Sequence, residues 1–146
     1  MSTFVLVHGA WQSAGTWDRV TPLLRGSGHN VVTPLLRGLG TDQQRLTADI
    51  SLERHVQDVA DELSRIQDEA ILVGHSYAGM IISGAAEANP SKVRALVFLD
   101  AFIPEDGQSV LDLLPAEIGE YFRKVAREHG EGWRLPEARG NSIFGD

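Results

Sequence analysis

Short apolar runs alternate along the chain with longer segments in which apolar residues recur at helical spacing. Strand-sized segments rich in β-favouring residues lie at 4–7, 29–33, 70–73 and 93–99, and the stretches 4–7, 70–73 and 95–99 within them are continuous apolar runs. Continuous apolar runs of this length are typical of strands buried on both faces of a parallel sheet. The alternation therefore predicts an α/β fold, a parallel sheet with helices on both faces.

The clearest helical periodicity begins at Ser51, which is a favourable N-cap residue. Apolar residues then recur every three or four positions, at Leu52, Val56, Val59, Leu63 and Ile66. This spacing puts them on one face of a helix. Helices are also predicted over 17–25 and 80–88, and the polar segment 37–50 is predicted to be an exposed loop.

The pattern changes after Asp100. The segment beyond it is interrupted by three prolines, at positions 104, 115 and 136. A helix is predicted over 116–128, and no further strand is predicted. We interpret residues 1–146 as a single domain, with β/α core units over 1–100 and a helical lid segment over 101–146.

Composition and charge narrow the function classes. The chain has 146 residues, 42% of them hydrophobic and 23% charged, as expected for one globular domain. No apolar run approaches the roughly 18 residues that a bilayer span needs, so no membrane partner is predicted. The formal net charge of −7 would repel a phosphate backbone, so no nucleic-acid partner is predicted.

The same sequence offers little for cofactor or metal chemistry. The absence of cysteine excludes disulfides, zinc-thiolate sites and cysteine nucleophiles. Metal-ligand clusters, phosphate-binding loops and dinucleotide fingerprints are also missing, so no metal and no cofactor are predicted. The first residues carry no export signal, which favours a cytoplasmic location.

The sharpest chemical signal is a serine between a predicted strand and a predicted helix. Residues 74–79 read Gly-His-Ser-Tyr-Ala-Gly, directly after the run 70–73. This resembles the G-x-S-x-G nucleophile elbow, a tight turn that lifts the serine hydroxyl above the carboxyl end of a sheet. Ala78 stands where the motif has its last glycine. Ser76 is the candidate nucleophile, and the alternative is an ordinary turn with a buried, hydrogen-bonded serine.

A second motif follows the first predicted strand, where residues 8–11 read His-Gly-Ala-Trp. Acyl transfer needs two N–H donors aimed at the oxyanion, one from the residue after the nucleophile and one from an early loop. By position, these donors are the amides of Tyr77 and Ala10. Gly9 would let the loop approach closely. Taken alone, His-Gly after a strand can also be a simple turn.

Together these motifs resemble the α/β-hydrolase fold superfamily. Within it, residues 4–11, 28–29 and 73–76, together with Trp17, are similar to the branch that holds bacterial esterases, plant methylesterases and hydroxynitrile lyases. Residues 98–109 look like the link between sheet and lid in the bacterial esterases. The resemblance implies a serine esterase that works through an acyl-enzyme.

Specific residue roles follow from that resemblance. It implies that Ser76 is the nucleophile and that the amides of Ala10 and Tyr77 form the oxyanion hole. Lyase members carry threonine where this chain has Gly9, which favours ester hydrolysis over C–C or C–CN bond lysis. The alternatives are such a lyase on the same fold, or a non-catalytic ligand-binding relative.

The general base and its acid are not found among these residues. In this fold they follow later strands, in the order serine, acid, histidine. None of the five histidines is well placed: His8 braces its loop, His75 points elsewhere, His29 and His55 are remote from the strand ends, and His129 ends a lid helix. Asp100 is a weak candidate acid, more simply explained as the cap of the next turn.

The resemblance therefore covers only the N-terminal part of such an enzyme. We expect the 146-residue chain to be inactive alone. In the strand order that the resemblance implies, the fourth strand would lie at an edge that normally pairs with a fifth parallel strand, and it would expose unpaired backbone groups and one apolar face. The missing C-terminal segment would belong to a longer polypeptide or act as a second chain.

Aromatic residues suggest the substrate class. Many apolar side chains lie in the predicted lid segment, and in such enzymes the lid covers the nucleophile and lines an apolar pocket. The predicted pocket residues are Trp11, Tyr121, Phe122 and Trp133. Together they favour a small-to-medium hydrophobic ester, although helices burying their own apolar faces explain at least half of the lid's apolar residues.

Overall fold

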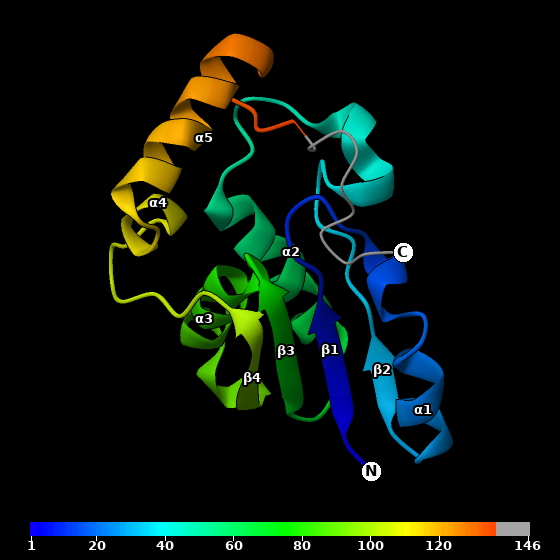
Figure 1. Cartoon of the computed structure of the whole chain (residues 1–146). Helices are drawn as coiled ribbons and strands as arrows, with labels where there is room; N and C mark the ends of the chain where they lie inside the picture. The colour runs from blue at the N-terminus through cyan, green and yellow to red at the C-terminus, as the bar shows by residue number, and fades with distance from the viewer. Residues whose placement is uncertain (137–146) are drawn as a thin grey trace. The chain divides into compact units, whose positions relative to one another are not determined.

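A computed structural model describes residues 1–136 of the chain (Figure 1). It contains two compact units, one over Met1–Val110 and a second that begins at Leu111. The last part of the predicted lid segment, residues 137–146, lies outside the described residues.

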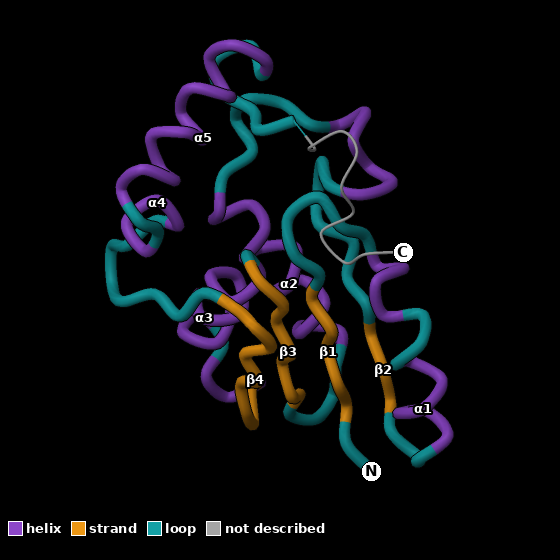
Figure 2. The backbone as a smooth tube through the Cα atoms, viewed as in Figure 1, coloured by secondary structure: helices purple, strands orange, loops and turns teal. Residues whose placement is uncertain are grey.

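The first unit is built on a four-stranded parallel sheet with the order β2-β1-β3-β4 (Figure 2). The strands are β1 (Thr3–Val7), β2 (Asn30–Val32), β3 (Ala70–Ser76) and β4 (Val93–Ala101). Each of the four apolar runs in the sequence forms one of these strands. The prediction of an α/β fold is therefore confirmed.

Helical segments connect each strand to the next. They are η1 (Ala14–Trp17), α1 (Thr21–Gly26), η2 (Gly40–Arg45), α2 (Leu52–Arg65), α3 (Ala78–Ala88) and η3 (Pro90–Lys92), where η marks a 3-10 helix. Ser51 is the N-cap of α2 by position and backbone, but its side chain makes no capping hydrogen bond.

Two local predictions need correction. The helix predicted over 17–25 is divided, because the 3-10 turn η1 ends at Trp17 and α1 starts separately with a proline in its first turn. The segment 37–50 is not simply an exposed loop. It contains η2, whose Asp42 is 4% exposed and accepts hydrogen bonds from the Gly38 amide at 3.0 Å and Arg45 Nε at 2.7 Å.

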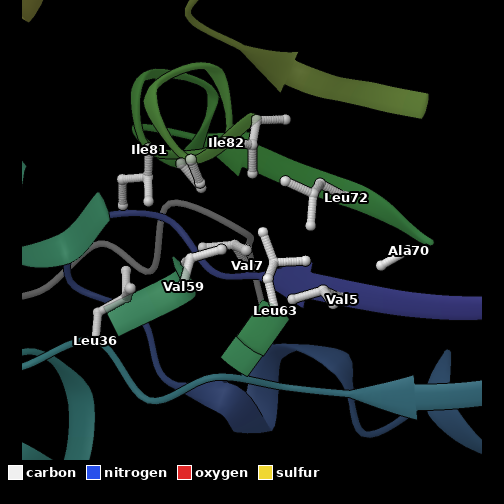
Figure 3. Close-up of a cluster of buried hydrophobic side chains, with 11 residues drawn as sticks. Val5, Val7, Leu36, Val59, Leu63, Ala70, Leu72, Ile81 and Ile82 are labelled. Atoms are coloured by element: carbon white, nitrogen blue, oxygen red, sulfur yellow. The ribbon is translucent and has the colours of Figure 1, made fainter. Parts of the chain in front are cut away.

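Helices cover both faces of the sheet, and alternate residues of each central strand enter different cores. Val5 and Val7 of β1 pack with side chains of α2 and α3, including Val59 and Ile81 (Figure 3). Leu6 faces the opposite side, where it packs with residues of other elements, namely Trp17, Val31 and Val73. This two-sided burial explains why the strands read as continuous apolar runs.

The strand β4 lies at one edge of the sheet. Leu96 and Phe98 pack against the core beside α2 and α3. On the other face, Val97 is 43% exposed and Leu99 is 49% exposed. Within the described residues, the expected edge strand with an exposed apolar face is therefore confirmed.

The second unit is helical. Helix α4 (Val110–Leu113) spans the boundary, and α5 (Ala116–His129) follows Pro115. The sequence predicted α5 to within one residue at its C-terminal end. None of the helices in the described part of the chain is both long enough and apolar enough to span a bilayer.

The turn between β3 and α3 leaves almost no room for side chains. Strand β3 ends at Ser76 and α3 begins at Ala78, so a single residue joins them. A Cβ built on Gly79 would overlap the carbonyl oxygen of Phe102, which follows β4. Ala78 is fully buried. Glycine is therefore needed at Gly79, one position after the usual place in the motif, and also at Gly74, where a Cβ would lie 2.8 Å from the Ala78 carbonyl oxygen.

We predict that Gly79→Ala destabilises the chain by about 2 kcal/mol or more, because overpacking against fixed backbone forces the elbow or the segment after β4 to move. The matched control is Gly26→Ala in α1, where a Cβ would meet nothing within 4 Å. That control should be neutral or slightly stabilising. Urea denaturation measures both variants, and equal midpoints would contradict the packing described for this turn.

Candidate active site

Ser76 occupies a strained position at the end of β3. Its φ is 54°, in the left-handed region that side chains other than glycine rarely adopt. Such a conformation costs on the order of 1–3 kcal/mol and persists only where the surrounding structure imposes it. The Ser76 carbonyl oxygen accepts a hydrogen bond from the Phe102 amide at 3.1 Å, which holds the turn. The side chain is only partly buried, so the alternative of a buried serine is not supported.

The neighbouring strand is irregular at the same level. His75 pairs with Leu99 and Ser76 pairs with Ala101, so Asp100 is an extra residue in a β-bulge. Asp100 also has a positive φ, 44°. Among the described residues its carboxylate makes no hydrogen bond or ion pair, so the cap that the sequence suggested is not formed there.

The loop after β1 approaches the serine closely. Strands β1 and β3 pair in parallel, with Val7 opposite Gly74, so their following loops leave the sheet side by side. A Cβ built on Gly9 would lie 3.1 Å from Ser76 Cβ and 3.1 Å from the His75 carbonyl oxygen. The sequence predicted that Gly9 lets its loop approach the serine closely, and the loop makes this approach at Ser76 and His75.

The two amides proposed for the oxyanion hole belong to these two loops. Tyr77 is the N-cap of α3, and Ala10 follows Gly9. Within residues 1–136, neither amide donates a hydrogen bond. Amides at a helix N-terminus are ready donors for a negative charge. The structure thus brings Ser76 and both loops together, while a role for these amides in catalysis stays a prediction.

The side chain of His8 holds the loop that follows β1 from inside the core. It is fully buried, its Nδ1 lies 2.9 Å from the Gly9 carbonyl oxygen, and the Leu36 amide donates a long hydrogen bond of 3.5 Å to Nε2. Burial lowers the pKa of His8 below its ordinary value. A neutral ring that donates from Nδ1 and accepts at Nε2 satisfies both contacts. His8 therefore braces the loop, as the sequence suggested.

His55 is nearer to the site than the sequence indicated. Its Nδ1 lies 3.0 Å from the Tyr77 hydroxyl, and its Nε2 lies 2.9 Å from the Arg37 carbonyl oxygen. The interpretation of His55 as remote was wrong, because α2 packs against α3 and carries this ring to the elbow. Burial, with the charge of Glu53, raises the pKa of the Tyr77 phenol. Both His55 nitrogens are occupied by these contacts.

Sequence reasoning also missed Gln12. Its side-chain oxygen accepts a hydrogen bond from the Gly9 amide at 2.9 Å and lies 3.1 Å from His75 Nδ1. No sequence motif marks a glutamine in this position. The only available signal was its place two residues after the candidate oxyanion residue.

No general base contacts the serine in the described part of the chain. Across residues 1–136, no histidine nitrogen is hydrogen-bonded to the Ser76 hydroxyl. The same residues hold no cluster of three or more side chains suited to a metal ion. The described site thus contains a strained serine and two amide-bearing loops.

The predicted pocket residues lie in both units. Trp11 is in the first unit, beside Ala10, partly buried and with a φ of 58°. Tyr121 and Phe122 lie on α5 of the second unit with ring centroids 6.2 Å apart, and Tyr121 is 60% exposed. Trp133 follows α5 and is 40% exposed. Their role in a substrate pocket stays a prediction.

Comparison with known proteins identifies the family. The model of the alpha/beta hydrolase family matches residues 4–146. A carbendazim hydrolyzing esterase of Nocardioides sp. (strain SG-4G) is 45% identical over 120 residues, which are 79% of this chain and 48% of that protein. Methylesterase 2 of Arabidopsis thaliana is 34% identical, over 89% of this chain and 48% of that protein. An alpha-hydroxynitrile lyase of Arabidopsis thaliana is 36% identical, over 70% of this chain and 40% of that protein.

Comparison with solved structures identifies the same family. An extracellular alpha/beta-hydrolase from a Paenibacillus species has a TM-score of 0.81 and 38% identity, covering 89% of this chain and 53% of that one. A pyrethroid hydrolase from Sphingobium faniae JZ-2 has a TM-score of 0.70 and 33% identity, covering 78% and 46%. The chain spans about half the length of these relatives. It belongs to the α/β-hydrolase family, on the branch whose relatives include esterases and a hydroxynitrile lyase.

Proposed function

We propose that this chain carries the nucleophile and the oxyanion hole of a serine esterase. The observation that carries the proposal is the strained φ of Ser76 at the start of α3, with the Gly9 loop in direct contact with it. A structure keeps a costly conformation of this kind chiefly at functional sites. The esterases among its relatives support the same reaction class.

The proposed chemistry proceeds through an acyl-enzyme. A general base removes the proton from Ser76 Oγ, which attacks the ester carbonyl carbon. The carbonyl oxygen becomes an oxyanion and accepts hydrogen bonds from the Ala10 and Tyr77 amides. Collapse of this intermediate breaks the bond to the alcohol oxygen, which leaves with the proton. Water, activated by the same base, then releases the carboxylic acid and restores Ser76.

We propose that the base and its acid are supplied by residues outside these 146, in a C-terminal part of a longer polypeptide or in a second chain. Three observations support this. No histidine in the described residues bonds to Ser76, and the relatives are about twice as long. In addition, β4 lies at an edge of the sheet, where a further strand could pair with its backbone, and its exposed apolar side chains leave one face for another element to cover.

We propose a small-to-medium hydrophobic carboxylic ester as substrate. Trp11, Tyr121, Phe122 and Trp133 would supply an apolar lining, and no cofactor is needed for this reaction. Bond lysis of the cyanohydrin type is the second candidate, because one relative is a hydroxynitrile lyase. Gly9 disfavours it, because the resemblance described above implies a threonine at that position in lyase members, and a Cβ on Gly9 would lie 3.1 Å from Ser76 Cβ.

Replacing Ser76 by alanine should abolish covalent labelling by a fluorophosphonate probe in the polypeptide that includes the C-terminal part, because no other oxygen is activated at this turn. Ser83→Ala is the matched control. Its hydroxyl bonds to the Gly79 carbonyl within α3, at 2.8 Å, and its loss should leave labelling intact. Labelling is read by intact mass. A probe that still attaches to Ser76→Ala would refute the nucleophile.

Gly9→Ala should lower kcat about tenfold or more in the same polypeptide. The new Cβ would lie 3.1 Å from Ser76 Cβ, so the loop and the Ala10 amide must move by a few tenths of an ångström. Losing one oxyanion donor outright costs about a hundredfold or more. Steady-state hydrolysis of a nitrophenyl ester measures the effect, with Gly26→Ala as control. An unchanged kcat would argue against a close oxyanion loop.

The isolated 146-residue chain should hydrolyse no ester above background, because no histidine is hydrogen-bonded to Ser76 within residues 1–136 and the proposal places the base elsewhere. Intact mass, size-exclusion chromatography and an esterase assay on one sample test this. The polypeptide with its C-terminal part is the positive control. A monodisperse species of 15.9 kDa with esterase activity would overturn the proposal that base and acid lie elsewhere.

A further inference from the structure

Gln12 bridges the two loops that carry the proposed oxyanion amides. Its single side-chain oxygen accepts a hydrogen bond from the Gly9 amide at 2.9 Å, one residue before Ala10. The same oxygen lies 3.1 Å from Nδ1 of His75, two residues before Tyr77. No other side chain among the described residues is hydrogen-bonded to both loops.

The donors and acceptors of this bridge are fixed by chemistry. A backbone N–H can only donate, so the Gln12 atom that it meets must be the carbonyl oxygen. That oxygen can only accept, so His75 must carry a proton on Nδ1. One carbonyl oxygen has two lone pairs and therefore serves both donors. The bridge thus sets both the side-chain orientation of Gln12 and the tautomer of the ring beside Ser76.

The backbone of Gln12 is fixed from a third segment. Gly40, with a φ of 56°, packs so closely that a Cβ on it would lie 2.7 Å from the Gln12 carbonyl oxygen. Only glycine fits there, because of both its conformation and the contact. Gln12 is also partly buried. Its backbone is held by the contact with Gly40, and its side chain is held by the Gly9 amide and His75. A side chain held at both ends can act as a rigid spacer.

We propose that Gln12 is a positioning residue for ester hydrolysis, which sets the separation of the Ala10 and Tyr77 amides. The inference rests on the proposed function. Oxyanion stabilisation requires donors 2.7–3.1 Å from where the negative charge develops, so small displacements of one loop are costly. Gln12 touches neither substrate nor reacting atoms in this role. Its removal should slow the chemical step and leave ground-state binding unchanged.

Phosphonylation of Ser76 by a fluorophosphonate tests the role, because its maximal rate, kinact, depends on the oxyanion donors, while KI reports reversible binding. The protein is the polypeptide that includes the C-terminal part. Gln12→Met keeps the length of the side chain and removes the acceptor. His75→Phe keeps a ring and removes the Nδ1 donor. Gln57→Met is the control, since the exposed Gln57 donates a hydrogen bond to Asp61 within α2, and to no other residue of the described part of the chain.

We expect kinact to fall at least tenfold in Gln12→Met and by less in His75→Phe, with KI within threefold of wild type. The double variant should be no slower than Gln12→Met, because both changes break one bridge. Gln57→Met should match wild type. Urea denaturation of each variant separates this from a merely structural role, which would change the unfolding midpoint and leave kinact of the folded protein unaltered.

Three results would overturn the inference. The first is an unchanged kinact in Gln12→Met. The second is a raised KI with unchanged kinact, which would make Gln12 a binding residue. The third result applies if Gln12→Met does not fold, and it is an unchanged kinact in His75→Phe. A wild-type protein that is not labelled at all would overturn the proposed function and this inference with it, whereas labelled wild type with unaffected variants overturns only the role of Gln12.

Discussion

The site depends on close backbone approach at the carboxyl edge of two paired strands. Strands β1 and β3 are parallel neighbours, with Val7 at the end of β1 opposite Gly74, so the segments that follow them leave the same edge of the sheet side by side. Small residues permit the close packing there, since Gly9 lies against Ser76 Cβ and the His75 carbonyl oxygen, and Gly79 lies against the carbonyl oxygen of Phe102. That crowding holds Ser76 in a left-handed conformation, and the burial of β1 and β3 on both faces compensates for the strain.

Polar side chains then fix the loops that the sheet has brought together. His8 holds the Gly9 carbonyl from within the core, and His55 holds the Tyr77 side chain through its ring. Gln12 joins the two loops directly. Each of these side chains bonds to a segment distant in sequence, so the network forms only when the α/β unit is folded. An oxyanion hole gains from this arrangement because its donors need no reorganisation during the reaction.

Much of this architecture could be predicted from the sequence, and the exceptions have physical reasons. Apolar runs reveal doubly buried strands, and Gly-x-Ser-x-Ala-Gly after such a run reveals the turn at Ser76. The contacts of Gln12 and His55 could not be predicted, because they join residues 63 and 22 positions apart through side chains that carry no motif. The divided helix before β2 was missed because the proline in the first turn of α1 starts a new helix. The edge position of β4 was predictable because the strand order of the family that the sequence resembles places the fourth strand beside a fifth, and no fifth strand is predicted after Asp100.

The most direct test of this account is a crystal structure of the phosphonate adduct of the polypeptide that includes the C-terminal part. We expect a covalent bond between phosphorus and Ser76 Oγ. We also expect a phosphonyl oxygen about 2.7–3.1 Å from the amide nitrogens of both Ala10 and Tyr77. Phosphorus on another residue, or an oxygen that faces away from both amides, would contradict this account.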